Sequence, residues 1–127
     1  MSRLRSMPYV IDPRADPVFP DNLEPDRDGL IAVGGDLSER VLLAAYRNGI
    51  FPWFSTGEPV LWWSPDPRCV LYPEKLQVST SLRQALKKGN YEVRFDTRFQ
   101  DVIRHCAAAR RKGQRGTWIT DRMIGAY

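Results

Sequence analysis

The sequence is poor in the side chains that build metal centres and disulfide frameworks. Its 127 residues include only two cysteines, Cys69 and Cys106, and one histidine, His105. These residues leave a structural zinc site one ligand short and lack the usual C-x-x-C spacing, so we expect no bound metal. Two distant thiols are also a poor framework for a secreted protein, which favours a reducing compartment.

Long apolar runs and low-complexity tracts are absent as well. No apolar stretch approaches the ~18 residues that a bilayer crossing needs, and residues 1–10 lack the apolar core of a signal peptide. The 10 prolines and 9 glycines are spread along the chain, and 43% of the residues are hydrophobic, which is a globular composition. We therefore expect a cytoplasmic protein that does not bind a membrane.

Charge is distributed unevenly along the chain. Residues 83–115 hold 10 basic and 3 acidic side chains, so their net charge is +7, whereas residues 1–82 hold 8 basic and 11 acidic ones, a net charge of −3. A concentrated basic segment is typical of a surface that binds a polyanion. The alternative is that these lysines and arginines are ordinary solvated surface.

The first half of the chain predicts turns followed by a helix. Residues 1–28 are rich in proline and aspartate and should form an extended arm with many turns. Ser38 is expected to cap a helix that ends at Asn48-Gly49. Asp36 lies at a turn, where capping the backbone is a simpler expectation than acting as a general base.

The rest of the pattern predicts alternating strands and helices, and hence an α/β (α+β) fold. Short strands are expected at 60–63, 69–72 and 91–95. Helices are expected from Ser81 to Gly89, from Asp96 or Thr97 to Lys112, and from Thr120 onward. The last helical pattern stops at Tyr127 without a C-cap, so we expect the sequence to be cut inside a domain.

Few residues qualify as catalytic from their spacing. His105 and Cys106 are neighbours on a predicted helix and point about 100° apart, so the imidazole cannot act as base for the thiol. Cys106 lies on the apolar face and is expected in the core. The glycines between residues 29 and 35 match neither the Walker nor the dinucleotide-binding spacing.

The tryptophans are the remaining candidates. Trp53 follows a proline and Trp118 follows Gly116-Thr117, so both lie in loop-like settings instead of apolar periodic runs. Tryptophan is frequent in the walls of apolar pockets because it brings a large ring and an N–H donor. The alternative is ordinary packing in a core or between domains.

Four segments together resemble one family of bacterial enzymes. They are residues 29–38 (GLIAVGGDLS), 44–54 (AAYRNGIFPWF), 61–68 (LWWSPDPR) and 116–120 (GTWIT). In order and spacing they are similar to the leucyl/phenylalanyl-tRNA–protein transferases. The resemblance runs from about Phe19 to Tyr127.

The resemblance implies an aminoacyltransferase that moves Leu, Phe or Met from aminoacyl-tRNA to the N-terminal Arg or Lys of a protein and so marks it for degradation by the N-degron pathway. It implies a small N-terminal domain over 1–64, followed over 65–127 by the first part of a GNAT-like acyltransferase domain. No cofactor is implied, and we expect a monomer.

The same match implies roles for particular residues. Trp53 and Trp118 would line the pocket for the aminoacyl-adenosine end, and Tyr46 is a weaker candidate for the same region. The basic surface for the tRNA backbone would include Arg83, Lys87 and Lys88.

The acid and amide that this family uses for proton transfer lie beyond Tyr127 in the resemblance, so no catalytic residue is expected in this chain and the chain alone is expected to be inactive. A non-catalytic RNA-binding module is the alternative function, with salt-sensitive binding that ignores whether the tRNA carries Leu. A third interpretation treats the tryptophans as a domain interface and the basic run as solvated surface.

Overall fold

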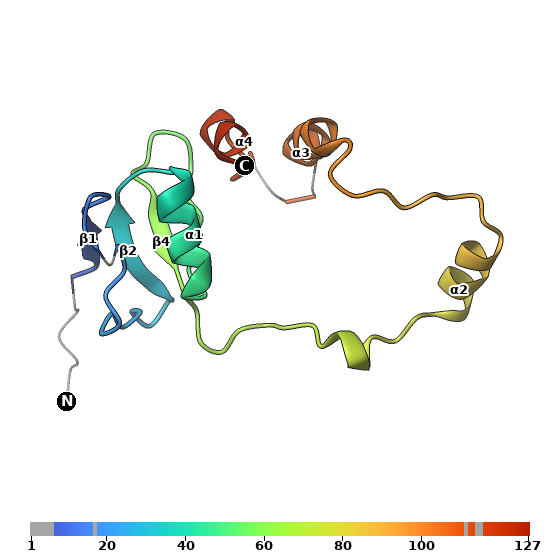
Figure 1. The fold of residues 1–127 in the computed structure, drawn as a ribbon, viewed down its shortest axis with the longest axis horizontal. Helices are drawn as coiled ribbons and strands as arrows, with labels where there is room; N and C mark the ends of the chain where they lie inside the picture. Colours follow the sequence, from blue (N-terminus) through green and yellow to red (C-terminus); the bar gives the residue numbers. More distant parts are fainter. Residues whose placement is uncertain (1–6, 17, 111, 114–115) are drawn as a thin grey trace. The chain divides into compact units, whose positions relative to one another are not determined.

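The structure is a computed structural model that describes residues 7–16, 18–110, 112–113 and 116–127. It divides into two compact units: Met1–Asp66 with Gln100–Tyr127, and Pro67–Phe99. Both helices and strands are present (Figure 1), which confirms the mixed α/β class.

A four-stranded sheet forms the centre of the first unit. Its strands are β1 (Tyr9–Ile11), β2 (Leu30–Gly34), β3 (Phe51–Pro52) and β4 (Leu61–Trp63), in the order β1-β2-β4-β3. β1 runs parallel to β2, whereas β4 is antiparallel to both β2 and β3. The strand predicted at 60–63 is therefore confirmed as β4.

The pairing of β2 with β4 contains a β-bulge. Leu30 lies opposite Trp63 and Ala32 opposite Trp62, so Ile31 is an extra residue on β2. An extra residue breaks the in-and-out alternation of a strand. Consistent with this, the adjacent Ile31 and Ala32 are both buried.

The helix predicted after Ser38 is confirmed as α1 (Glu39–Arg47), which covers one face of the sheet (Figure 1). Ser38 occupies the N-cap position, but its side chain makes no cap hydrogen bond. Asp36 Oδ1 instead accepts a hydrogen bond from the Ser38 backbone N–H at 2.9 Å. The expectation that Asp36 caps a turn is thus confirmed.

The core of the first unit joins distant parts of the chain. Trp62 is fully buried, and its ring meets that of Phe19 edge-on at 5.3 Å between centroids. From the far end of the sequence, α4 (Asp121–Ala126) contributes Met123, which is 1% exposed. Thr120 caps α4 as predicted, because its hydroxyl accepts from the Met123 backbone N–H.

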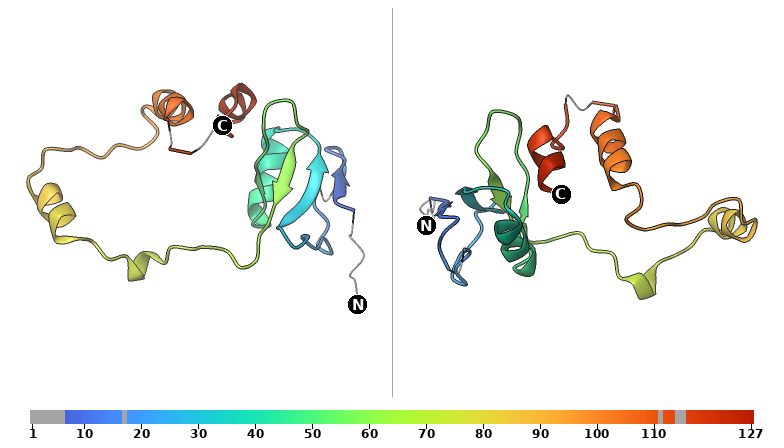
Figure 2. Two further views of the ribbon diagram at one scale, coloured as in Figure 1. Left: turned by 180° about the vertical axis from the view of Figure 1, so that it is seen from behind. Right: turned by 45° about the horizontal axis from the view of Figure 1, so that its top comes forward.

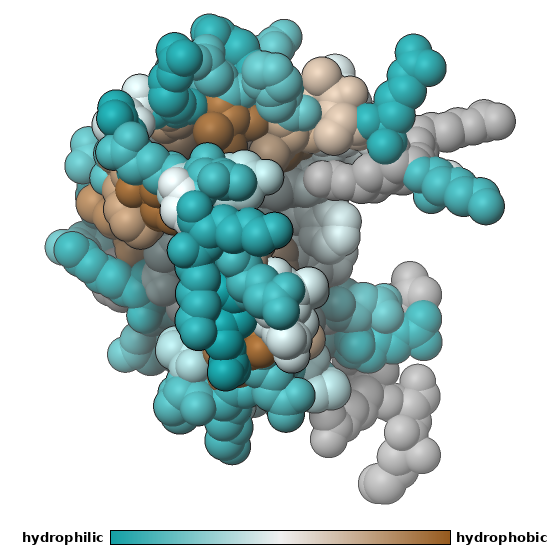
Figure 3. All heavy atoms as spheres, turned by 90° about the vertical axis from the view of Figure 1, so that its right-hand side faces the viewer, coloured by the Kyte–Doolittle hydropathy of each residue, from teal (hydrophilic) through white to brown (hydrophobic). Residues whose placement is uncertain are grey.

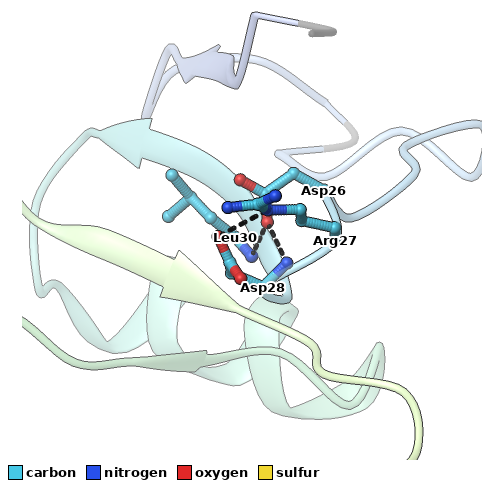
Figure 4. Close-up of polar contacts among 4 residues, drawn as sticks. All are labelled: Asp26, Arg27, Asp28 and Leu30. Carbon is cyan, nitrogen blue, oxygen red and sulfur yellow. Dashed lines mark hydrogen bonds and ion pairs between the residues drawn. The ribbon is translucent and has the colours of Figure 1, made fainter. Parts of the chain in front are cut away.

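Aspartates form the turns of the N-terminal arm. Asp26 Oδ1 accepts from the backbone N–H groups of Asp28 and Leu30, both at 2.9 Å, as Figure 4 shows. The Asp26 backbone N–H in turn donates to the Leu30 carbonyl at 2.8 Å. Local bonds of this kind explain why aspartate favours turns. They hold Asp28 and Gly29 beside the start of β2.

Arg40 ties the arm to α1. Its guanidinium donates to the carbonyl oxygens of Pro13 at 2.5 Å and Ala15 at 2.6 Å. Bonds from a charged donor are stronger than neutral ones. The arm therefore has a defined position against the first unit.

The second unit contains the short 3₁₀ helix η1 (Pro73–Lys75) and α2 (Thr80–Lys87), joined by extended chain (Figure 2). The prediction of a helix up to Gly89 is confirmed, but Ser81 is not its cap. Ser79 is the N-cap, and its hydroxyl accepts from the Leu82 backbone N–H at 3.2 Å. Ser79 lies three residues before Leu82, the spacing that N-caps use.

The strands predicted at 69–72 and 91–95 are wrong. Both segments are exposed and belong to none of the four described strands. Alternating apolar residues form a strand only where a neighbouring strand pairs with the backbone and covers the apolar face. Neither condition is met for these segments among the described residues.

The helix expected from Asp96 or Thr97 begins later, as α3 (Phe99–Ala108). Asp96 has φ 56°, in the left-handed region, which a right-handed helix excludes. Cys106 is exposed, so its predicted place in the core is wrong. Hydrophobic surface, in brown, is visible on the face drawn in Figure 3. Val102 of α3 is one of the exposed large apolar residues.

We expect Gly29→Ala to destabilise the first unit. Gly29 has φ +95°, and an added Cβ would lie 2.7 Å from Pro65 Cα. Gly57→Ala is the matched control, because Gly57 has φ +88° but nothing within 4 Å of an added Cβ. Left-handed strain should cost each variant about 1–2 kcal/mol, and the backbone clash should add about 1–3 kcal/mol at Gly29 alone. Equal denaturation midpoints for the two variants would contradict this account.

Asp36 should contribute stability that depends on pH. Hydrogen bonds from Ser38 lower the pKa of Asp36, and the charge of Arg40 acts in the same direction. Because the folded-state pKa lies below the unfolded value of about 3.9, this contribution is present above that pH and is lost as pH falls through the folded-state pKa. The unfolding free energy of the parent should exceed that of Asp36→Asn by about a few tenths of a kcal/mol at pH 7. Urea titrations at falling pH should show that this difference in unfolding free energy disappears. A difference independent of pH would contradict the stabilising role of the Asp36 carboxylate.

Candidate functional site

A cleft of about 480 Å³ opens on the first unit, along β3, β4 and the loop between them. Its walls are mainly apolar, with four aromatic residues and two carboxylates among the lining groups. The lining residues are Asp28, Phe51, Trp53, Phe54, Ser55, Glu58, Leu61, Trp63 and Pro65. A concave site with apolar walls and a few polar groups is the usual form of a small-ligand pocket.

Backbone and indole hydrogen bonds position Trp53 in this cleft. The Trp53 backbone N–H donates to the Leu61 carbonyl at 2.9 Å, and Trp63 Nε1 donates to the Trp53 carbonyl at 2.7 Å. Trp53 itself remains 56% exposed. A large aromatic ring held open to solvent by a fixed backbone is suited to contact a ligand.

The acidic groups of the cleft belong to short ordered turns. The Ser55 backbone N–H donates to Glu58 Oε2 at 2.7 Å, and the Glu58 N–H donates to the Ser55 carbonyl at 3.1 Å. Asp28 Oδ2 lies 3.5 Å from Arg27 Nε, an ion pair drawn in Figure 4. Sequence reasoning missed both Asp28 and Glu58, since neither belongs to a recognisable motif.

Tyr46, on α1, forms a hydrogen bond between its hydroxyl and that of Tyr127 at the end of α4. The two rings meet edge-on, with centroids 6.3 Å apart. Partial burial raises the pKa of Tyr127, and the hydrogen bond with Tyr46 raises it further. The pair joins two helices that are distant in sequence. Tyr46 is 50% exposed and does not line the cleft.

Trp118 lies in the turn that precedes α4. Its carbonyl accepts from the Thr120 N–H at 3.0 Å, and its side chain is 37% exposed. Trp118 is not among the residues that line the cleft. The structure therefore brings Trp53 to the cleft and leaves the two other predicted pocket residues, Trp118 and Tyr46, outside it.

The predicted tRNA-binding residues all lie on or next to α2, in the second unit. Arg83 and Lys87 are one helical turn apart and therefore share a face, and Lys88 is the C-cap. All three side chains are exposed. Within the described part of the chain they make no ion pair with a carboxylate. They are suited to contact phosphates.

The two cysteines and the histidine do not line the cleft. No group of three or more His, Cys, Asp or Glu side chains among the described residues could hold a metal ion. Cys69 and Cys106 are exposed free thiols. His105 Nδ1 donates to the Asp101 carbonyl at 2.7 Å and lies on the exposed side of α3. In the same described ranges, every helix is too short or too polar to cross a bilayer.

Residues 35–66 match the leucyl/phenylalanyl-tRNA protein transferase N-terminal domain, and residues 70–127 match the leucyl/phenylalanyl-tRNA protein transferase model. The two matches follow one another along the chain with a gap of only a few residues.

Curated relatives carry the same family name. A leucyl/phenylalanyl-tRNA–protein transferase of Oleidesulfovibrio alaskensis is 57% identical over 109 residues, which are 86% of this chain and 44% of the relative. One of Myxococcus xanthus is 52% identical over 119 residues (94% and 51%), and one of Nitrosospira multiformis is 61% identical over 100 residues (79% and 43%). The chain thus spans about half the length of the curated relatives it matches. These matches, at high identity and in the expected order, show that the chain belongs to the leucyl/phenylalanyl-tRNA–protein transferase family.

Proposed function

We propose that this protein takes part in the transfer of Leu, Phe or Met from aminoacyl-tRNA to the N-terminal Arg or Lys of acceptor proteins, which marks them for degradation. The observation that carries the proposal is the consecutive match of residues 35–66 and 70–127 to the two models of one transferase family. The name of that family specifies a tRNA and a protein as the two substrates.

The chemistry of such a transfer makes modest demands on the protein. An aminoacyl ester is already activated, so the enzyme has to orient an α-amine against the ester carbonyl, accept its proton and stabilise the oxyanion. No metal or covalent intermediate is required. We assign no proton-transfer role to any residue of 1–127.

We also propose that the chain contains parts of two domains. Residues 1–64 would form the small N-terminal domain, and residues 65–127 would belong to a GNAT-like acyltransferase domain. The protein would act as a monomer in the cytoplasm, where aminoacyl-tRNA is available.

Trp53, Trp118 and Tyr46 are the proposed contacts for the aminoacyl-adenosine end. Support comes from exposure: each of the three residues is at least 37% exposed although it lies in or beside an ordered element. An adenine base stacks well on an exposed indole. An apolar pocket separates side chains by size at only about 1–3 kcal/mol per methylene, so one pocket tolerates Leu, Phe and Met.

Arg83, Lys87 and Lys88 are the proposed contacts for the tRNA backbone. Their side chains are exposed and carry three positive charges over six residues, in α2 and at its C-cap. Contacts of this kind position a nucleic acid without reading its sequence. They suit an enzyme that must accept more than one aminoacyl-tRNA.

The transfer assay that tests this function uses radiolabelled Leu-tRNA and a peptide with an N-terminal Arg. Two proteins are compared: this chain, and this chain joined to the part of the Oleidesulfovibrio alaskensis relative that follows the matched segment. Transfer by the joined protein is expected. Its absence, with the relative itself active under the same conditions, would overturn the proposal.

Trp53→Ala in the joined protein should lower kcat/KM for Leu-tRNA by about 10- to 100-fold, since stacking on an aromatic ring contributes about 1–3 kcal/mol. Leu43→Ala is the control, because Leu43 is also an exposed apolar residue of the first unit but does not line the cleft. Circular dichroism verifies that both variants fold. Equal kcat/KM values for the two variants would show that Trp53 does not contact the aminoacyl-tRNA.

Replacing Arg83, Lys87 and Lys88 together by Gln should weaken tRNA binding uniformly for Leu-tRNA and uncharged tRNA. It should also reduce the slope of log Kd against log salt by about 2–3, because each phosphate contact contributes nearly one unit. Arg27→Gln with Arg47→Gln is the control, as both arginines lie outside α2. An unchanged salt slope would show that α2 is solvated surface only.

The same measurements separate the transferase from a non-catalytic RNA-binding module. The module would bind tRNA with a strong salt dependence and yet transfer no Leu in the joined protein. Its specific support is the exposed basic face of α2, which needs no catalytic group to bind phosphates.

A further inference from the structure

We propose that α4 is the positioning element for the proposed aminoacyl-tRNA contacts, and that Arg122 is the positioning residue that holds this helix against the segment carrying Trp53. The inference rests on the proposed function, because Trp53, Trp118 and Tyr46 are the proposed contacts for the aminoacyl-adenosine end. Only Trp53 of these three lines the cleft. Each of the three is nevertheless tied to a different part of α4.

Arg122 connects α4 to the residue that follows Trp53. Its guanidinium carbon lies 5.2 Å from the centre of the Phe54 ring, and a cation in such a position is attracted by the ring quadrupole. Phe54 lines the cleft and is only 3% exposed, since it also belongs to the core. Arg122 itself is exposed, and within the described part of the chain it forms no ion pair with a carboxylate. Its charge is therefore directed at the ring.

The start of α4 is bonded to the turn that contains Trp118. The Trp118 carbonyl accepts from the Thr120 N–H at 3.0 Å. The residue before Trp118 makes a similar local bond, since the Thr117 hydroxyl accepts from the Ile119 N–H at 3.1 Å. The Thr120 hydroxyl in turn caps α4. Because each of these bonds spans only two or three residues, the backbone of Trp118 follows the position of the helix.

The end of α4 is bonded to Tyr46. Tyr127, the C-cap of α4, shares a hydrogen bond between hydroxyls with Tyr46. Their rings meet edge-on with centroids 6.3 Å apart, an arrangement that is attractive beyond the area it buries. Both residues are about half exposed, so this contact is not imposed by a surrounding core.

The middle of α4 is fixed by the core of the first unit. Met123 is 1% exposed, and Ala126 packs against the same cluster. These two residues are three apart and so share one face of the helix. A helix as short as Asp121–Ala126 is not stable by itself. Its position, and with it the positions of the segments bonded to its two ends, depends on its contacts with the rest of the unit.

A pocket whose walls come from distant parts of the chain gains affinity when those walls are held in place before the ligand arrives. Ordering them during binding would cost free energy that is then lost from the affinity. α4 supplies this constraint, because one helix adjoins Trp118, bonds to Tyr46 and contacts the neighbour of Trp53. Loss of the Arg122 contact should therefore weaken binding of the aminoacyl-tRNA and have no direct effect on the acceptor peptide.

The first experiment follows the indole N–H signals of this chain by NMR. Arg122→Gln removes the cation from the contact and should shift the signals of Trp53 and Trp118, whereas Arg122→Lys keeps a cation and should shift them less. The signal of Trp62, a core residue, should stay in place and so verify the fold. Arg14→Gln, at an exposed arginine of the arm outside the cleft, is the control. Unchanged Trp53 and Trp118 signals in Arg122→Gln overturn the proposal.

Kinetics of the joined protein test whether the contact serves the site. Arg122→Gln should raise KM for Leu-tRNA about two- to fivefold, as expected for the loss of an exposed cation–π contact, and leave kcat and the KM for the peptide unchanged. Arg122→Lys should restore most of the lost affinity. A lower kcat at an unchanged KM for Leu-tRNA would indicate fewer folded molecules and would overturn the positioning role.

The other end of the helix gives a second test. Tyr127→Phe removes the hydroxyl and keeps the ring, so it should also raise KM for Leu-tRNA, by about twofold or more. Combined with Arg122→Gln, its effect should be smaller than the product of the two single effects, because both act through α4. Effects that multiply would show that the two contacts act independently and would overturn the common role of α4.

The outcomes separate this inference from the proposed function. No transfer of Leu by the unsubstituted joined protein would overturn the function, and the role of α4 in it as well. Transfer by the parent with an unchanged KM for Leu-tRNA in Arg122→Gln would leave the function standing and overturn the role of Arg122 alone.

Discussion

The first unit depends on the burial of the Trp62 indole ring. Its side chain is fully buried, and its Nε1 donates to the Gly34 carbonyl at 2.9 Å, so the polar atom that burial would leave unpaired is satisfied. The same ring packs against Phe19, and Met123 of α4 joins the same core. The core around this residue of β4 thus includes side chains from the arm, the sheet and α4.

The candidate site follows from the same strand. Successive side chains of a strand point to opposite faces, so with Trp62 directed into the core, Trp63 is directed away from it. Trp63 lines the cleft, and its indole holds the Trp53 carbonyl. The conformation that exposes Trp53 is therefore coupled to the core: a shift of β4 by one residue would exchange the buried and the exposed tryptophan and remove the cleft.

The local sequence patterns correctly predicted the helices whose apolar side chains are buried. They failed for segments whose apolar side chains are exposed. The caps and spacing of 38–49 and 120–127 gave α1 and α4 correctly, because Val41 and Met123 are buried as their patterns require. The alternation at 91–95 is equally regular, yet it forms no strand, because pairing depends on a partner that local sequence does not specify. The acids of the cleft were missed for the same reason: Asp28 and Glu58 are 30 residues apart, and only the folded chain brings both into the lining of one cleft.

The uneven charge of the sequence has a simple physical meaning in this fold. The proposed reaction joins a polyanion to a chain whose first residue is cationic, so its two substrates need surfaces of opposite sign. The exposed cations of α2 belong to the second unit, and the carboxylates of the cleft belong to the first. Had the two signs been mixed on one surface, ion pairs between them would have neutralised both. The cations of α2 make no ion pair with a carboxylate among the described residues, so they stay available to a polyanion, and salt would weaken the contacts proposed between them and the tRNA.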